Sequence, residues 1–197
     1  MSRQVLGFMA MLLSLCASAL QAGAGPLEDA ATAYNRGNYA QLYEILQPLA
    51  GSGNAEAQYR LGNMYFFGTG VPQDYAKAVD QYAKAAVQGH AAAQAMLGNQ
   101  LQRGLGVPRD DFSGLMWFQR SAEQGNLDGQ LLLSGAYHYG WGTKPDLALA
   151  YKWVLLAVAT APMYRVDLQA VERDATEEER TVGRKLALEF RPRPERQ

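Results

Sequence analysis

A unit of 36 residues occurs twice in this sequence and a third time in altered form. The three copies occupy residues 55–90, 91–126 and 127–160. A period of 20–50 residues is typical of stacked structural units, each of which buries its apolar face only against its neighbours. The period therefore predicts an array of similar units. The residues that the copies share are expected to build this array and to say little about its function.

Each copy has the pattern of two helices joined by a glycine-containing loop, because apolar residues recur every three or four positions in both halves. In the first copy, Gly68 ends the first helix by adopting a left-handed backbone, and Asp74 starts the second by accepting a free amide hydrogen. Gly62 lies inside the first helix, where glycine costs about 1 kcal/mol relative to alanine. A glycine kept at that position predicts a close approach of two helices. The third copy has Ser134 there.

Further helices are expected on both sides of the three copies. Residues 26–53 have the pattern of a shortened opening helix pair, and residues 163–190 that of two capping helices. Thr176 precedes Glu179 by three positions, which predicts a capping box at the start of the last helix. The residues expected to face inward from that helix are Val182, Leu186 and Phe190, with Leu188 beside them. The predicted fold is all-α: a right-handed α-solenoid of antiparallel helix pairs, built as one repeat domain over residues 26–190.

The two ends of the chain differ from the repeats. Arg3, the uncharged apolar run at residues 5–20 and the Ala-x-Ala patterns after it are typical of a secretory signal peptide, which we place at residues 1–22. That run is short for a membrane span of about 20 residues, so we expect export without a stable membrane anchor after cleavage. Cleavage would remove Cys16, the only cysteine, and with it any disulfide. Residues 191–197 alternate proline and arginine and predict a disordered tail.

Charge and side-chain chemistry argue against several classes of function. The chain has 18 Lys plus Arg and 19 Asp plus Glu, which predicts no basic face for a nucleic acid. The two histidines, His90 and His138, lack the partners and the spacing of a metal site. The Gly-x-Gly loops lack the preceding strand and the Lys-Ser/Thr pattern of a phosphate-binding loop. No nucleophile–base pair is apparent at a readable spacing. We therefore expect no metal, no cofactor and no catalytic activity.

The shared residues resemble a known repeat. The pattern Ala-x-Ala-Gln-x-x-Leu-Gly-x-x-Tyr, followed by Gly-x-Gly-Val, an aspartate and a closing Gln-Gly, is similar to the Sel1-like repeat, a relative of the tetratricopeptide repeat with a longer loop. In the first copy its main positions are Ala55, Ala57, Gln58, Leu61, Gly62, Tyr65, Gly68, Gly70, Val71, Asp74, Tyr82, Gln88 and Gly89. The second copy departs from it at Leu101 and Gly114, and the third at Ser134 and Thr143. The resemblance implies an α-solenoid that binds proteins or peptides as an adaptor, and its secreted bacterial members are often envelope or signalling proteins.

The resemblance also implies that the first helix of each copy lines a concave face. The candidates for partner contact on that face are Tyr59, Asn63, Phe66, Phe67, Asn99, Gln102, Arg103, Leu131, His138 and Tyr139, with Trp141 in the adjacent loop. Arg103 could hold a carboxylate through two hydrogen bonds, and the aromatic residues could anchor a partner or pack between repeats. The leading hypothesis is a non-catalytic protein-binding adaptor of the bacterial cell envelope, periplasmic or secreted. The alternative is a protein that binds or acts on cell-wall glycan through the same groove.

Overall fold

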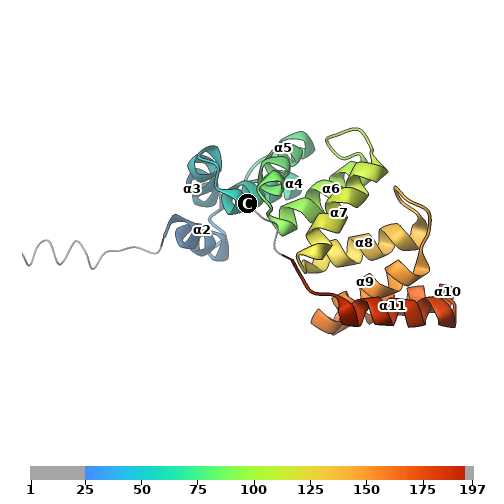
Figure 1. The fold of residues 1–197 in the computed structure, drawn as a ribbon. Helices are drawn as coiled ribbons and strands as arrows, with labels where there is room; N and C mark the ends of the chain where they lie inside the picture. Colours follow the sequence, from blue (N-terminus) through green and yellow to red (C-terminus); the bar gives the residue numbers. More distant parts are fainter. Residues whose placement is uncertain (1–24, 194–197) are drawn as a thin grey trace, which may run out of the picture. The chain divides into compact units, whose positions relative to one another are not determined.

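The computed structural model describes residues 25–193, which are mostly helical and contain no strand. The helices are α2 (Pro26–Asn35), α3 (Tyr39–Gly51), α4 (Ala55–Phe67), α5 (Tyr75–Val87), α6 (Ala91–Arg103), α7 (Asp111–Glu123), α8 (Leu127–Tyr139), α9 (Leu147–Thr160), the 3-10 turn η1 (Pro162–Tyr164), α10 (Arg165–Asp174) and α11 (Glu177–Glu189). Figure 1 shows them in chain order. The predicted signal peptide at residues 1–22 and the last four tail residues, 194–197, lie outside the described residues.

The chain divides into two compact units within α3, between Ile45 and Leu46. In the first unit, Gly37 has a φ of +69° and reverses the chain after α2. The backbone N–H of Gln41 then donates to Asn38 Oδ1 at 3.2 Å, so Asn38 caps α3.

The second unit contains the three repeated helix pairs, α4/α5, α6/α7 and α8/α9, followed by α10/α11. Each second helix packs on the first helix of the next pair, as α5 does on α6 and α7 on α8. The first helices α6 and α8 also pack on each other. Figure 1 shows this succession from α4 to α11. Stacking of each pair on its neighbours is the arrangement of an α-solenoid, and the predicted fold class is confirmed.

The loops inside the helix pairs have the predicted geometry. The glycines that close the first helices are Gly68, Gly104 and Gly140, with φ of +69°, +66° and +76°. The aspartates that cap the second helices, each accepting the backbone N–H three residues later, are Asp74, Asp110 and Asp146. The second glycine of the loop makes a contact that the sequence did not predict, as Gly106 shows. A Cβ on Gly106 would lie 2.3 Å from the carbonyl carbon of Tyr75, so this loop lies on the preceding repeat.

The small residue inside each first helix is matched to the side chain that faces it. A Cβ on Gly62 would lie 2.7 Å from the ring of Tyr82, which confirms the predicted close approach. In the third repeat, Val154 replaces this aromatic ring and leaves room for Ser134, whose hydroxyl donates to Ala150 O at 2.8 Å. The third copy therefore departs from the pattern at two positions that compensate for each other.

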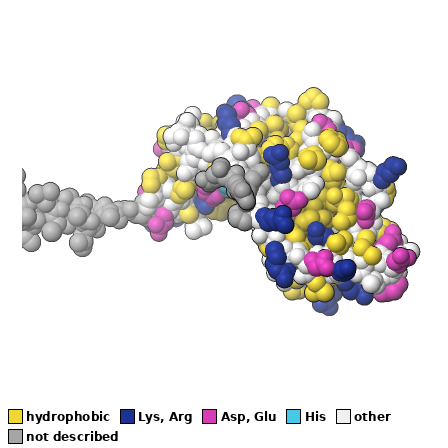
Figure 2. Space-filling view, in the orientation of Figure 1, with side chains coloured by type: hydrophobic (Ala, Val, Ile, Leu, Met, Phe, Trp, Pro, Cys, Tyr) yellow, Lys and Arg dark blue, Asp and Glu magenta, His cyan; other side chains and the backbone are white. Residues whose placement is uncertain are grey.

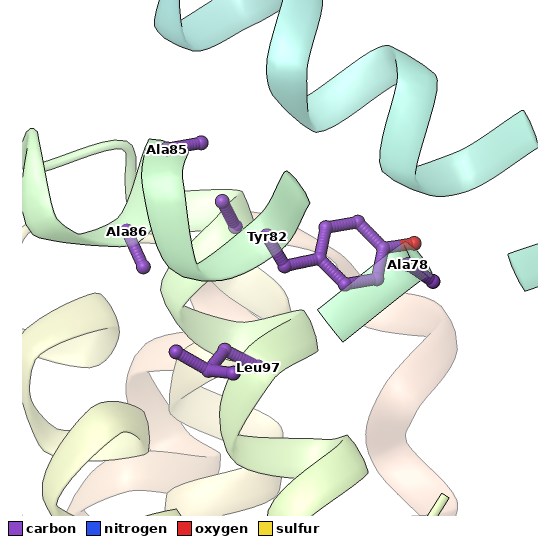
Figure 3. Close-up of a cluster of buried hydrophobic side chains, with 6 residues drawn as sticks. Ala78, Tyr82, Ala85, Ala86 and Leu97 are labelled. Atoms are coloured by element: carbon purple, nitrogen blue, oxygen red, sulfur yellow. The ribbon is translucent and has the colours of Figure 1, made fainter. Parts of the chain in front are cut away.

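Each hydrophobic core crosses a repeat boundary. Figure 3 shows Tyr82 of α5 buried with alanines of its own helix and with Leu97 of α6, which belongs to the next repeat. The core that joins the second and third repeats contains Leu115, Phe118, Ala122, Leu133, Ala136 and Trp153. A repeat therefore depends on its neighbour for part of its core.

Buried glutamines also connect neighbouring repeats. Gln94 of α6 donates to a carbonyl oxygen of α5 at 3.1 Å and accepts a bond from Gln124 at 2.7 Å. Gln58 makes the same two kinds of bond one repeat earlier. Gln130 is its equivalent in the third repeat, but Thr160 occupies the position of the second glutamine. Consequently Gln130 Oε1 is buried without a hydrogen-bond partner among residues 25–193.

The last helix pair continues the stack. His138 of α8 bonds Asp174 of α10, which is 36 residues later, so α10 follows α8 at the repeat period. The predicted inward face of α11 was wrong at two residues, because Val182 is 44% exposed and Leu188 78%. Gly183 is buried against α9 instead, where a Cβ would lie 2.7 Å from a backbone oxygen. This close approach of α11 to α9 turns both apolar side chains outward.

The start of α11 and the chain after it are both held by hydrogen bonds. The predicted capping box of Thr176 and Glu179 is confirmed. Past α11, the backbone N–H of Arg193 donates to Glu123 O of α7 at 2.8 Å, so the chain is held three residues beyond the predicted boundary at 190.

Figure 2 shows acidic and basic side chains gathered over the end of the unit formed by α9, α10 and α11.

Candidate functional site

The candidate residues occupy four equivalent positions on the first helices α4, α6 and α8. Counted in steps of 36 residues, the four rows are Tyr59 and Leu131; Asn63 and Asn99; Phe66, Gln102 and His138; and Phe67, Arg103 and Tyr139. Because α6 packs directly on α8, equivalent positions on these two helices are neighbours. The fourth row lies at the carboxyl ends of the helices, immediately before the left-handed glycines.

The fourth row is exposed. Phe67 is 64% exposed and Tyr139 60%. Arg103 is also exposed and makes no ion pair or hydrogen bond with another side chain of residues 25–193. Tyrosine and arginine are among the residues that contribute most binding energy in protein interfaces, and phenylalanine is enriched there. We call Phe67, Arg103 and Tyr139 the exposed row.

Asn63 and Phe66 are occupied by contacts inside the first repeat. Tyr82 donates its hydroxyl to Asn63 Oδ1 at 2.6 Å, and its ring lies 6.5 Å from that of Phe66. Burial raises the pKa of Tyr82, so the hydroxyl keeps its proton. The second repeat has Phe118 in place of this tyrosine. Asn99 therefore lacks the equivalent bond, and its side chain has no other within the described chain. Asn99 is available to a partner, whereas Asn63 is not.

Tyr59 belongs to a cluster at the junction of the first two repeats. Its ring stacks on His90 with the ring centres 4.7 Å apart. His90 caps α6, because its Nδ1 accepts the backbone N–H of Ala93, and its Nε2 lies 2.9 Å from Glu56 Oε2. Since Nδ1 is the acceptor, the proton of the neutral ring is on Nε2 and is donated to Glu56. Tyr59 is therefore half-buried and held by this stack.

The hydrogen bond from His90, followed by those from Arg60, lowers the pKa of Glu56 to about 2 from 4.5. A carboxyl group of this kind stabilises the fold fully above its ordinary pKa, and the contribution is lost as the pH falls through the folded value. We expect an NMR titration of the full chain to place the Glu56 midpoint near pH 2. In H90N the cap is kept, as Asn54 caps α4, but the bond to Glu56 is lost and the midpoint should rise. An unchanged midpoint would contradict this role of His90.

The third repeat brings three candidate residues together. The rings of His138 and Tyr139 stack at 4.4 Å, and Tyr139 lies 5.0 Å from Trp141. His138 Nε2 lies 2.8 Å from Asp174 Oδ2. Arg173 also donates to Asp174, and these two partners, Arg173 first, lower the pKa of Asp174 to about 2. At neutral pH Asp174 is thus ionised and fixes the position of the His138 ring.

A small cavity of about 70 Å³ lies between α8, α9 and α10. Three of the candidate residues, Leu131, His138 and Tyr139, are part of its wall. The remaining wall residues are Ser134, Gly135, Val154, Asp167, Ala170 and Val171. The polar groups of Ser134 and His138 already have partners within the protein, whereas Asp167 adds a charged group to the wall.

The structure adds residues of α10 that the sequence did not predict for the site. Asp167 and Asp174 lie near the candidate residues because α10 follows α8 in the stack. The 36-residue spacing between His138 and Asp174 was the signal that could have identified them. Gln102, a predicted contact residue, is half-buried, and its Nε2 has no hydrogen-bond partner among the described residues.

Two searches for other kinds of site give plain results for residues 25–193. No group of three or more His, Cys, Asp or Glu side chains is arranged to hold a metal ion. No helix in this part of the chain is long and apolar enough to cross a membrane.

The repeats can now be compared with known families. Residues 55–90, 91–126 and 127–159 each match the Sel1 repeat, and together these matches span more than half of the chain. The chain belongs to the Sel1 repeat family. Sel1 repeat proteins generally act as scaffolds for protein–protein interaction and are typically not catalytic.

Two crystal structures are similar to this Sel1 repeat protein. One is a Sel1 repeat protein from Oxalobacter formigenes, with 26% identity and a TM-score of 0.65 over 71% of this chain and 58% of that chain. The other is c5321, a protective antigen present in uropathogenic Escherichia coli strains, with 25% identity and a TM-score of 0.57 over 77% of this chain and 40% of that one. The match therefore spans only about half of those longer chains. No curated protein matches this chain.

Proposed function

We propose that this Sel1 repeat protein is a non-catalytic adaptor of the bacterial cell envelope that binds a protein or peptide on the face of its first helices. The observation that carries the proposal is the exposed row. Three successive repeats present an interface-type side chain at the same position, in Phe67, Arg103 and Tyr139, and none of the three belongs to a core cluster. The predicted signal peptide at residues 1–22 supports a periplasmic or secreted location.

The other candidate residues divide between contact and support. Asn99 has an amide without an internal partner, and Trp141 extends the aromatic stack of Tyr139. Tyr59, Asn63 and Phe66 are held in contacts of the repeat itself, and we assign them to the support of the face.

The test compares partner capture by three forms of the full chain. In the first variant, Phe67, Arg103 and Tyr139 are all changed to alanine. The matched control changes Val87, Phe112 and Lys185 to alanine, three exposed residues on other helices, of which Phe112 is 64% exposed like Phe67. After crosslinking in the native host, we expect the amount of captured partner to fall at least tenfold in the first variant and to stay at the wild-type level in the control. Both should keep the helical circular dichroism of the wild type.

Full partner capture by the folded triple variant would contradict the proposal. Sedimentation with purified peptidoglycan runs in parallel, because the aromatic stack of Tyr139 and Trp141 could also lie against a sugar ring. Co-sedimentation that depends on the exposed row, without any crosslinked protein, would favour a cell-wall glycan as the ligand.

A further inference from the structure

Three charged side chains on the face of the first helices, Arg103, Asp128 and Asp167, have no partner of opposite charge within the described chain, and of the two acids only Asp167 is part of the cavity wall. Arg103 lies at the carboxyl end of α6, and Asp167 lies in the first turn of α10. A second pair on α10, Arg173 and Asp174, is neutralised internally by a hydrogen bond of 2.9 Å. Complementary charges on a binding partner fix its register and orientation on a surface. Arg103 and Asp167 therefore offer one positive and one negative contact to a partner, on opposite sides of α8.

The cavity of about 70 Å³ lies between these two points, against α8 and α10. Its wall includes the exposed residues Tyr139 and Asp167 and the apolar side chains of Leu131, Val154 and Val171. An apolar cavity of about 150 Å³ is known to hold a benzene molecule. A space of about half that volume suits a small aliphatic side chain and not an aromatic ring.

The spacing of the helices sets the length of a ligand that would reach both charges. α6 packs on α8, and the 2.8 Å bond from His138 to Asp174 joins α8 to α10. With about 8–10 Å between the axes of neighbouring helices, α6 and α10 are separated by about 18 Å. Arg103 and Asp167 also differ by eight equivalent positions along the helix, which is about 12 Å at 1.5 Å per residue. The resulting diagonal of about 22 Å corresponds to about six to seven residues of extended chain at 3.3 Å per residue.

We infer that the partner contributes an extended peptide segment with an Asp or Glu, a Lys or Arg about six to seven residues away, and a small aliphatic residue between them, nearer the basic one. This inference rests on the proposed function. The acidic residue pairs with Arg103 next to the free amide of Asn99, and the peptide passes Tyr139. Its aliphatic side chain enters the cavity, and its basic residue reaches Asp167.

The experiment is a selection of random twelve-residue peptides on the full chain, followed by fluorescence anisotropy with the selected peptides. We expect a consensus with an acidic and a basic residue at this spacing. R103E and D167K should each weaken binding about tenfold, in line with the usual strength of charge-assisted hydrogen bonds. The double variant R103E/D167K should bind the peptide whose two charges have been exchanged better than it binds the original peptide.

The outcomes separate this inference from the proposed function. Selected peptides that require Phe67 and Tyr139 but tolerate both charge reversals would overturn the inference and leave the proposed function standing. Partner capture in the native host that survives the loss of the exposed row would overturn the proposed function itself. Failure to select any peptide, or a dimer in analytical ultracentrifugation that R103E dissociates, would also overturn the inference, since the second result would make another copy of the chain the occupant.

Discussion

Replacing Phe118 with alanine is expected to lower the free energy of unfolding by about 3–5 kcal/mol. Phe118 is 1% exposed and lies in the core that joins the second and third repeats, with Leu133 and Trp153. Its ring also fills the space beside Gly98, where a Cβ would lie 2.7 Å from two ring carbons. Removing the ring leaves a cavity between closely packed helices and weakens the contact between repeats on which a solenoid depends. Guanidinium unfolding followed by circular dichroism measures the loss.

Phe112→Ala is the matched control for this prediction. Phe112 lies on the same helix, α7, but is 64% exposed. Its removal should change the free energy of unfolding by no more than about 0.5 kcal/mol. Similar losses in Phe118→Ala and Phe112→Ala would mean that the ring of Phe118 is not a core element.

Gly106→Ala is expected to destabilise the protein more than Gly104→Ala, although both glycines have a left-handed backbone, with φ of +74° and +66°. Both substitutions share the cost of a side chain in that conformation, about 1–2 kcal/mol. A Cβ at Gly104 would lie 3.4 Å from the side chain of Arg109, which is close to an ordinary contact. At Gly106 it would lie 2.3 Å from the backbone of Tyr75. A side chain can change rotamer to avoid the new Cβ, but the backbone of Tyr75 cannot. We therefore expect Gly106→Ala to lower the free energy of unfolding by a further amount of about 1–3 kcal/mol.

The difference between the two unfolding free energies isolates the contact between the loop and α5. Equal losses in the two variants would contradict that contact. Gly142 occupies the same position in the third repeat, and a Cβ there would lie 2.2 Å from Asp111 O. Gly142→Ala should therefore repeat the large loss if the contact is a general feature of the stack.

The sequence was sufficient for the elements that depend on a few neighbouring residues. Helix ends such as Gly68 and Asp74 follow from the backbone preference of glycine and from the reach of a short acidic side chain to the next free amides. The capping box of Thr176 and Glu179 is equally local. These features could be predicted because no distant residue has to be placed correctly first.

The candidate site was predicted less completely, because the contacts that hold or free each candidate side chain join residues from different helices. Asn63 and Asn99 occupy the same position in their repeats. The hydroxyl of Tyr82 donates to Asn63, but the equivalent residue in the repeat of Asn99 is Phe118, which has no hydroxyl. The sequence predicted a capping helix where α10 lies but not its place beside the site, because its residues lack the repeat pattern although Asp174 binds His138 at the repeat distance. In each case the deciding contact joins residues 19 or 36 positions apart.

The sequence by itself determined the period, the helix pairs, their loops and the α-solenoid, because a repeated pattern of apolar residues, glycines and caps encodes one supersecondary unit several times. Only the tertiary structure decided which side chains of the first helices remain free. Phe67, Arg103 and Tyr139 are exposed, whereas Tyr59 is half-buried against His90. The physical reason is that exposure results from the packing of neighbouring repeats, and this packing differs wherever the copies differ.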